Sequence, residues 1–129
     1  MKKNKHILWL IFLMLFIGGY GISCKQNSDE DLDKRIEDTK HLQGHRKEII
    51  DGMLDGGLAS RIENPSGEPY IYVTQPFYLL SKGEQASLLN VVWYYFITQD
   101  RSLGVLTIYD EDTGNEIGTF GRKGLLMGE

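Results

Sequence analysis

Three carboxylates lie close together near the C-terminus, at Asp110, Asp112 and Glu116, with Gly114 between them. Oxygen ligands at short spacing suit calcium, and the EF-hand loop supplies them with Gly at its sixth position and Glu at its twelfth. Counted from Asp110, however, Gly114 is the fifth residue and Gly121 the twelfth. The spacing therefore predicts an acidic, solvated hairpin turn without specific calcium binding.

Two histidines, His41 and His45, lie four residues apart, the spacing that places two metal ligands on one face of a helix. A third ligand could come from Glu37, Asp38 or Glu48. The segment around them is polar and offers no buried partners that would orient metal ligands. We therefore expect a solvated surface here, with no metal and no cofactor.

Catalytic chemistry finds little support in the sequence. The Gly-x-Ser-x-Gly motif of serine hydrolases is absent, and the loop Gly121–Gly124 is not followed by a predicted helix that could bind phosphate. Four carboxylates are available as a general acid and base: Glu63, Glu68, Glu84 and Asp100. Because nothing in their spacing selects two of them, we predict that the protein is not an enzyme.

The charge balance argues against two classes of partner. Lys2, Lys3 and Lys5 are the only charged residues among the first 23, and the rest of the chain holds 11 basic and 18 acidic residues. A net charge near −7 gives no basic surface for nucleic acid and no electrostatic attachment to anionic lipid. We expect no nucleic-acid partner.

The N-terminus has the three parts of a secretory signal. A basic start at residues 1–6 precedes the apolar run Ile7–Ile17 and a segment of mostly small residues that ends at Ser23. The apolar run is shorter than the roughly 20 residues that span a bilayer. We therefore predict a signal peptide over residues 1–23. Extending the run to Ser23 gives 17 residues, so a retained signal anchor is the alternative.

Cys24 is the only cysteine, so it can form neither an internal disulfide nor a cysteine metal cluster. Its position directly after Gly21–Ser23 resembles the lipobox of bacterial lipoproteins. In that family a small residue precedes the cysteine, which is acylated, for example with palmitate, and becomes the mature N-terminus. The match is imperfect, because Gly21 replaces the usual Leu and follows Tyr20.

The resemblance implies lipid attachment at Cys24 and a stable anchor, since several acyl chains hold a protein on a membrane. In cells with two membranes, a residue other than Asp after the cysteine permits transfer to the outer membrane, and here that residue is Lys25. We therefore expect a lipid-anchored protein of the cell envelope, on the cell membrane or outer membrane, that faces the periplasm or the exterior.

The segment that follows the cysteine is polar, with Leu32, Ile36 and Leu42 as its apolar residues. Three apolar residues are too few for a core face. We predict a flexible charged tether over residues 24–44, whose ends would lie roughly 25 Å apart. The folded domain is then expected over residues 45–129.

Apolar spacing predicts a short helix at the start of this domain, over residues 45–55, ended by two glycines. Two strands around a turn follow, over residues 58–63 and 70–74. A second pair of strands, over residues 105–109 and 116–120, flanks the Asp110 turn. Between the pairs, Ser81 and Glu84 have the form of a capping box. This favours a long helix over residues 81–98, although a strand also suits the composition of residues 91–97.

The order α-β-β-α-β-β predicts an α+β fold, with a small antiparallel sheet of about four strands and its helices on one face. The long helix is apolar around most of its circumference, wider than the stripe of a surface helix. We expect the short helix to cover part of it; a second copy or a partner protein is the alternative. The residues that form either core or interface are Leu88, Trp93, Tyr95 and Phe96.

Three functions remain open. The first is a non-catalytic envelope lipoprotein whose domain binds another protein, or a second copy, or reinforces an assembly. The second is a small-ligand or peptide-binding module that uses Tyr70, Tyr72, Phe77 and Tyr78, and exposed aromatic side chains would favour it. The third is a hydrolase, which requires two carboxylates that converge in a cleft.

Overall fold

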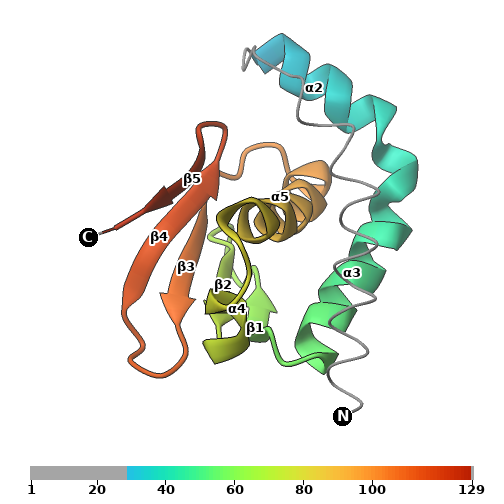
Figure 1. Ribbon diagram of the computed structural model, residues 1–129. Helices are drawn as coiled ribbons and strands as arrows, with labels where there is room; N and C mark the ends of the chain where they lie inside the picture. Colours follow the sequence, from blue (N-terminus) through green and yellow to red (C-terminus); the bar gives the residue numbers. More distant parts are fainter. Residues whose placement is uncertain (1–28, 129) are drawn as a thin grey trace.

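The computed structural model describes residues 29–128 (Figure 1). Cys24 and the predicted signal lie outside the described residues, so the anchor stays a prediction. The helices are α2 (Asp29–Asp38), the 3-10 turn η1 (Lys40–Leu42), α3 (Gln43–Asp55), α4 (Gln75–Tyr78) and α5 (Lys82–Gln99). The strands are β1 (Ala59–Glu63), β2 (Tyr70–Val73), β3 (Leu106–Asp110), β4 (Glu116–Gly121) and β5 (Gly124–Met127). No helix within residues 29–128 is long and apolar enough to cross a bilayer.

The five strands form one sheet in the order β1-β2-β3-β4-β5. Sequential neighbours pair antiparallel except β2 and β3, which are parallel because α5 carries the chain back across the sheet between them. The α+β class is confirmed, but the predicted sheet is corrected in two respects: it has five strands, and it is mixed. The fifth strand follows a two-residue turn at Arg122 and Lys123, where Gly124 has a φ of 83°.

The predicted long helix is confirmed as α5, and its start is the predicted capping box. The Ser81 side chain accepts from the Glu84 backbone N–H at 3.1 Å, and the Glu84 carboxylate accepts from the Ser81 N–H at 2.8 Å. This exchange satisfies two backbone donors that a helix N-terminus otherwise leaves free. The local signal therefore outweighs the strand-like composition of the second half of the helix.

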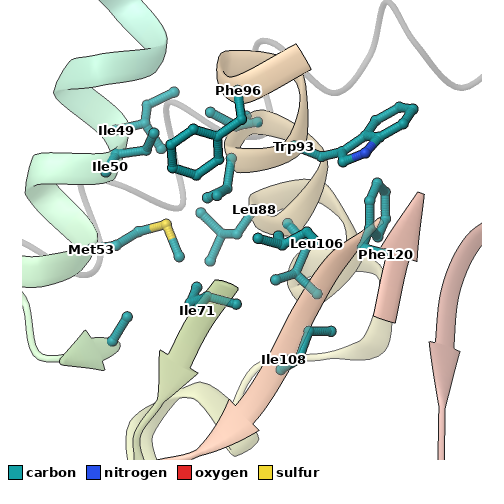
Figure 2. Packing of buried hydrophobic residues seen from close by; sticks show 14 of the residues in the cluster. Ile49, Ile50, Met53, Ile71, Leu88, Trp93, Phe96, Leu106, Ile108 and Phe120 are labelled. Atoms are coloured by element: carbon teal, nitrogen blue, oxygen red, sulfur yellow. The ribbon is translucent and has the colours of Figure 1, made fainter. Parts of the chain in front are cut away.

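The core lies between α5 and the sheet on one side, and between α5 and α3 on the other (Figure 2). Trp93 is 4% exposed, packs edge-to-face against Phe120 of β4, and donates from its indole N–H to the Gly104 carbonyl at 2.9 Å. Met53 of α3 is fully buried in the same cluster. Two layers thus cover the broad apolar surface of α5, and the short helix supplies the second, as expected.

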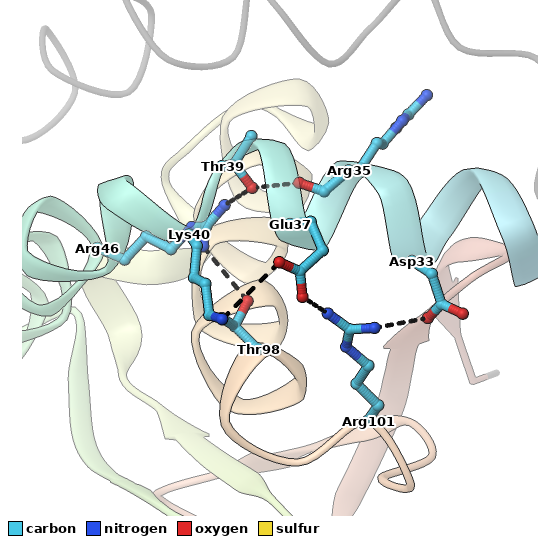
Figure 3. Close-up of polar contacts among 8 residues, drawn as sticks. All are labelled: Asp33, Arg35, Glu37, Thr39, Lys40, Arg46, Thr98 and Arg101. Carbon is cyan, nitrogen blue, oxygen red and sulfur yellow. Dashed lines mark hydrogen bonds and ion pairs between the residues drawn. The ribbon is translucent and has the colours of Figure 1, made fainter.

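Residues 29–44 do not form the predicted tether. Residues 29–38 are helical, and Ile36, which is 1% exposed, packs into the core beside α5 together with the half-buried Leu32. On the surface, Arg101 pairs with Asp33 and Glu37 of α2 (Figure 3). The tether prediction is wrong for this stretch because two apolar residues one helical turn apart suffice when a neighbouring helix receives them.

A buried arginine fixes the junction of α2 and α3 against α5 (Figure 3). The Arg46 guanidinium donates to the Thr39 hydroxyl at 2.7 Å and the Gln43 side chain at 2.7 Å, and to Thr98 of α5 at 3.4 Å. It also lies 5.2 Å from the centre of the Tyr94 ring. Burial lowers the pKa of Arg46, because its hydrogen-bond partners are neutral oxygens and desolvation disfavours the charge. The folded domain therefore starts before residue 45, the boundary that the sequence predicted.

Candidate binding face

Strand alternation gives the sheet two different sides. Ile71 and Val73 of β2, like Leu106 and Ile108 of β3, are buried on the side that carries α3 and α5 (Figure 1). The residues between them point to the opposite side, where no helix among the described residues packs. We call this surface the tyrosine face; it consists of Arg61, Glu63, Tyr70, Tyr72, Thr107, Tyr109 and Thr119.

Three half-buried tyrosines form the centre of this face. The rings of Tyr72 and Tyr109 are stacked, with centroids 4.9 Å apart and planes 18° apart. Tyr70 meets both edge-on, at 5.5 Å from Tyr72 and 6.1 Å from Tyr109. Both arrangements are favourable for aromatic quadrupoles, so the three rings stabilise one another where no helix of residues 29–128 covers them.

Two charged side chains of β1 frame the rings. The Arg61 guanidinium lies 4.5 Å from the centre of the Tyr72 ring and 6.0 Å from that of Tyr70, within the range of a cation–π interaction. The Tyr70 hydroxyl donates to Glu63, and this bond to a carboxylate raises the pKa of Tyr70. The face therefore presents three phenol rings, one cation and one anion.

The acidic turn after Tyr109 is held by neighbouring segments. Asp110 accepts from the Tyr78 hydroxyl of α4 at 2.7 Å and from the Thr113 backbone N–H at 2.9 Å. These bonds lower the pKa of Asp110, while desolvation and the same bond raise that of Tyr78. Glu111 accepts from Ser60, and Asp112 accepts from Gln75.

Within residues 29–128, no three His, Cys, Asp or Glu side chains are grouped closely enough to hold a metal ion. His41 is exposed, and His45 lies 3.4 Å from Glu48 in the next turn of α3. The acidic turn has the hairpin geometry that its spacing predicted, with Gly114 at a φ of 76°.

The candidate acid and base residues are dispersed and have local structural roles. Glu84 caps the start of α5, and Asp100 follows its other end, about 27 Å away for an 18-residue helix. Hydrogen bonds from Ser102 lower the pKa of Asp100, which keeps it ionised, and Glu63 is bonded to Tyr70 on the tyrosine face. These three carboxylates do not converge in a cleft.

The other predicted site residues divide between core and surface. Leu88, Trp93 and Phe96 are 1%, 4% and 8% exposed, and Tyr95 is half-buried beside them on α5. Of the aromatic residues assigned to a binding module, Phe77 is buried. Tyr70, Tyr72 and Tyr78 reach the surface, with Tyr78 39% exposed.

Four residues of the tyrosine face were not among the predicted site residues: Tyr109, Arg61, Thr107 and Thr119. The signal for Tyr109 was present, since it alternates with the apolar Leu106 and Ile108 in a two-residue period. Arg61 carried no comparable signal, because a register shift between Ala59 and Arg61 decides its side of the sheet.

Comparison of the chain with protein-family models, with curated proteins and with solved structures found no match.

Proposed function

We propose that this chain is a membrane-anchored, non-catalytic protein-interaction module that binds its partner through the tyrosine face. The observation that carries this proposal is the cluster of Tyr70, Tyr72 and Tyr109 on the side of the sheet where no described helix packs. Tyrosine and arginine are enriched among the residues that dominate protein interfaces. Rings that are already ordered lose little conformational entropy when a partner binds.

The location of the cluster favours a macromolecular partner over a small ligand. Small-molecule sites are concave and bury most of the ligand, whereas these rings lie across neighbouring strands on one side of a sheet. A tyrosine-rich surface of this kind resembles a paratope, in which rigid amphipathic side chains supply contact area. Three of the four candidate carboxylates of a hydrolase instead accept hydrogen bonds in a helix cap, in a turn and from a tyrosine.

A peptide-binding function is the second candidate, and β5 is the observation that favours it. Among residues 29–128 this strand pairs with β4 alone and forms one edge of the sheet, with Leu126 54% and Met127 40% exposed. An extended peptide can add to such an edge through main-chain hydrogen bonds. The half-buried Tyr70 and Tyr72 are compatible with this function too.

The anchor that we propose at Cys24 places the module close to lipid. Helix α2 begins at Asp29, five residues after the cysteine. Five residues reach at most about 18 Å even when fully extended. The partner is therefore met near the membrane surface, which suits a component of the same membrane or one bound to it.

The experiment is a crosslinked pull-down of the full-length protein from membranes of its native host. The test variant replaces Tyr72 and Tyr109 with Ser; the control replaces Lys47 and Asp51, an exposed ion pair of α3, with Ser. We expect the wild type and the control to retain one discrete partner and the test variant to lose it while remaining folded by circular dichroism. Retention of the same partner by the folded test variant would disprove the proposal.

A further inference from the structure

A single row of residues paired in register crosses four strands of the sheet, from three residues of the tyrosine face to Glu116 of β4. Arg61 pairs in register with Tyr72, Tyr72 with Tyr109, and Tyr109 with Glu116. β1 and β3 flank β2 on opposite sides. The Tyr72 ring is thus occupied on both faces, by the Arg61 guanidinium at 4.5 Å and the Tyr109 ring at 4.9 Å.

The row ends differently on its β4 side. Among residues 29–128, Tyr109 makes ring contacts with Tyr70 and Tyr72, and no ring or cation stacks on it from the β4 side. The residue paired with it there is Glu116, whose side chain is exposed and has no hydrogen-bond or ion-pair partner in the described part of the chain. The Cα partner of the Tyr109 backbone on β4 is thus a carboxylate residue, next to the register shift between Ile108 and Tyr109.

These two groups favour the same ligand chemistry. An aromatic face attracts an organic cation through its quadrupole, and a carboxylate adds a charge-assisted hydrogen bond that a guanidinium can receive in bidentate form. The turn that follows Tyr109 adds Asp110, Glu111 and Asp112 at the same end of the sheet. Arg61 already makes a contact of this kind within the chain, because its guanidinium lies over the Tyr72 ring at the opposite end of the stack.

We infer that the end of this row, between Tyr109 and Glu116, is a subsite for a cationic side chain of the partner protein, with arginine the best fit. The inference rests on the proposed function, because it assigns the chemistry of the partner that the tyrosine face binds. The bound cation would add one more group to the stack that Arg61, Tyr72 and Tyr109 form within the chain. Charge complementarity supports this partner, since the chain after residue 23 carries 18 acidic and 11 basic residues.

The test uses the full-length protein in nanodiscs of zwitterionic lipid, with ¹³C-labelled tyrosine rings observed by NMR. The probe is the peptide acetyl-Gly-Arg-Gly-amide, and its uncharged control carries citrulline in place of arginine. We expect the arginine peptide to shift the Tyr109 ring signals in a saturable manner, with an affinity at least fivefold above that of the citrulline peptide.

Variants locate the subsite. Glu116→Gln and Tyr109→Leu should each weaken the arginine peptide by roughly two- to fivefold, as for an exposed ion pair or cation–π contact; for Tyr109→Leu the Tyr72 signals serve as readout. Glu68→Gln makes the same charge change in the exposed turn between β1 and β2 and should have no effect. Equal binding of the citrulline peptide, or equal losses in Glu116→Gln and Glu68→Gln, would overturn the inference.

The two proposals fail separately. If the tyrosine face retains a partner in the pull-down but the arginine peptide does not shift Tyr109, the cation subsite is wrong and the interaction module stands. If the peptide binds at Tyr109 but the partner is indifferent to Tyr72 and Tyr109, the proposed function is wrong.

Discussion

At the scale of single residues, the main distinction is between aromatic side chains that stabilise the fold and those left at its surface. Trp93 and Tyr72 both make ring contacts, but Trp93 is buried between α5 and β4, whereas Tyr72 is half-buried on the tyrosine face. Composition alone cannot separate them. Burial separates them, and it predicts opposite consequences for substitution.

Replacement of Trp93 by Ala should lower the free energy of unfolding by about 3–5 kcal/mol, because it removes a large buried side chain. Trp93→Phe should lower the free energy of unfolding by a smaller amount, which reflects in part the loss of the hydrogen bond to the Gly104 carbonyl. Urea unfolding of residues 25–129, followed by circular dichroism, measures both. Leu79→Ala is the control, because Leu79 is 86% exposed and should change stability by less than about 0.5 kcal/mol. An unchanged Trp93→Ala protein would show that α5 is not central to the core.

The hydrogen bond from Tyr78 to Asp110 predicts a pH effect. It holds the pKa of Asp110 below its ordinary value of 3.8. The carboxylate therefore contributes stability that is fully present above the unfolded pKa and is lost as the pH falls through the lower, folded value. Tyr78→Phe should raise the pKa of Asp110 toward 3.8 in a carboxyl NMR titration, because the largest cause of its lowering is removed. An unchanged pKa of Asp110 in the variant would mean that the hydrogen bond from Tyr78 does not form in solution.

At the scale of elements, the sequence predicted those whose signals are local. The capping box at Ser81 and Glu84 located the start of α5, and the Gly114 turn located the β3–β4 hairpin. The elements it missed depend on contacts across the fold. Helix α2 is polar except for Leu32 and Ile36 and becomes stable by packing against α5, and β5 is a four-residue edge strand that follows a short turn.

The candidate site was predicted in part for the same reason. Tyr70 and Tyr72 were singled out as surface aromatics, but their proximity to Tyr109 follows from the parallel pairing of β2 with β3. That pairing depends on the crossover through α5, and no local pattern in either strand predicts it. Residue types were thus readable from the sequence, whereas the row that joins them was not.

Substitution of Ile36 tests whether α2 belongs to the domain. Ile36→Ala should destabilise residues 25–129 by about 2–5 kcal/mol, because the side chain is 1% exposed in the core. Lys34→Ala changes an exposed residue of the same helix and should have little effect. Equal stability of the two variants in urea would support the flexible tether that the sequence predicted over residues 24–44.

At the scale of the whole molecule, the fold has two distinct ends. Helix α2, whose start follows the proposed anchor, lies at the same end as the β4–β5 turn, and the acidic β3–β4 turn lies at the other (Figure 1). The strands run between these ends, so the tyrosine face extends from one to the other. If the domain is attached to the membrane through Cys24, just before α2, the acidic turn points away from the membrane.

The distance between the anchor that we propose at Cys24 and the start of α2 can be measured by neutron reflectometry of the full-length, membrane-bound protein on a supported bilayer. Protein density should begin within about 18 Å of the headgroups, and a 20-residue Gly/Ser insertion before Asp29 should move it outward. Cys24→Ala should remain an unprocessed precursor without acyl mass. A gap of roughly 25 Å in the wild type would contradict the packing of α2 against the domain.

The central claim, that the tyrosine face is the binding surface, is tested most directly by a photo-crosslinker placed on each side of the molecule. Benzoylphenylalanine is introduced in living cells at Thr119 on the tyrosine face and, in a separate protein, at exposed Glu48 on α3. We predict one discrete adduct from position 119 that disappears when Tyr72 and Tyr109 are replaced by Ser, and none from position 48. An adduct from position 48 alone, or one from position 119 that persists in the double variant, would contradict the account.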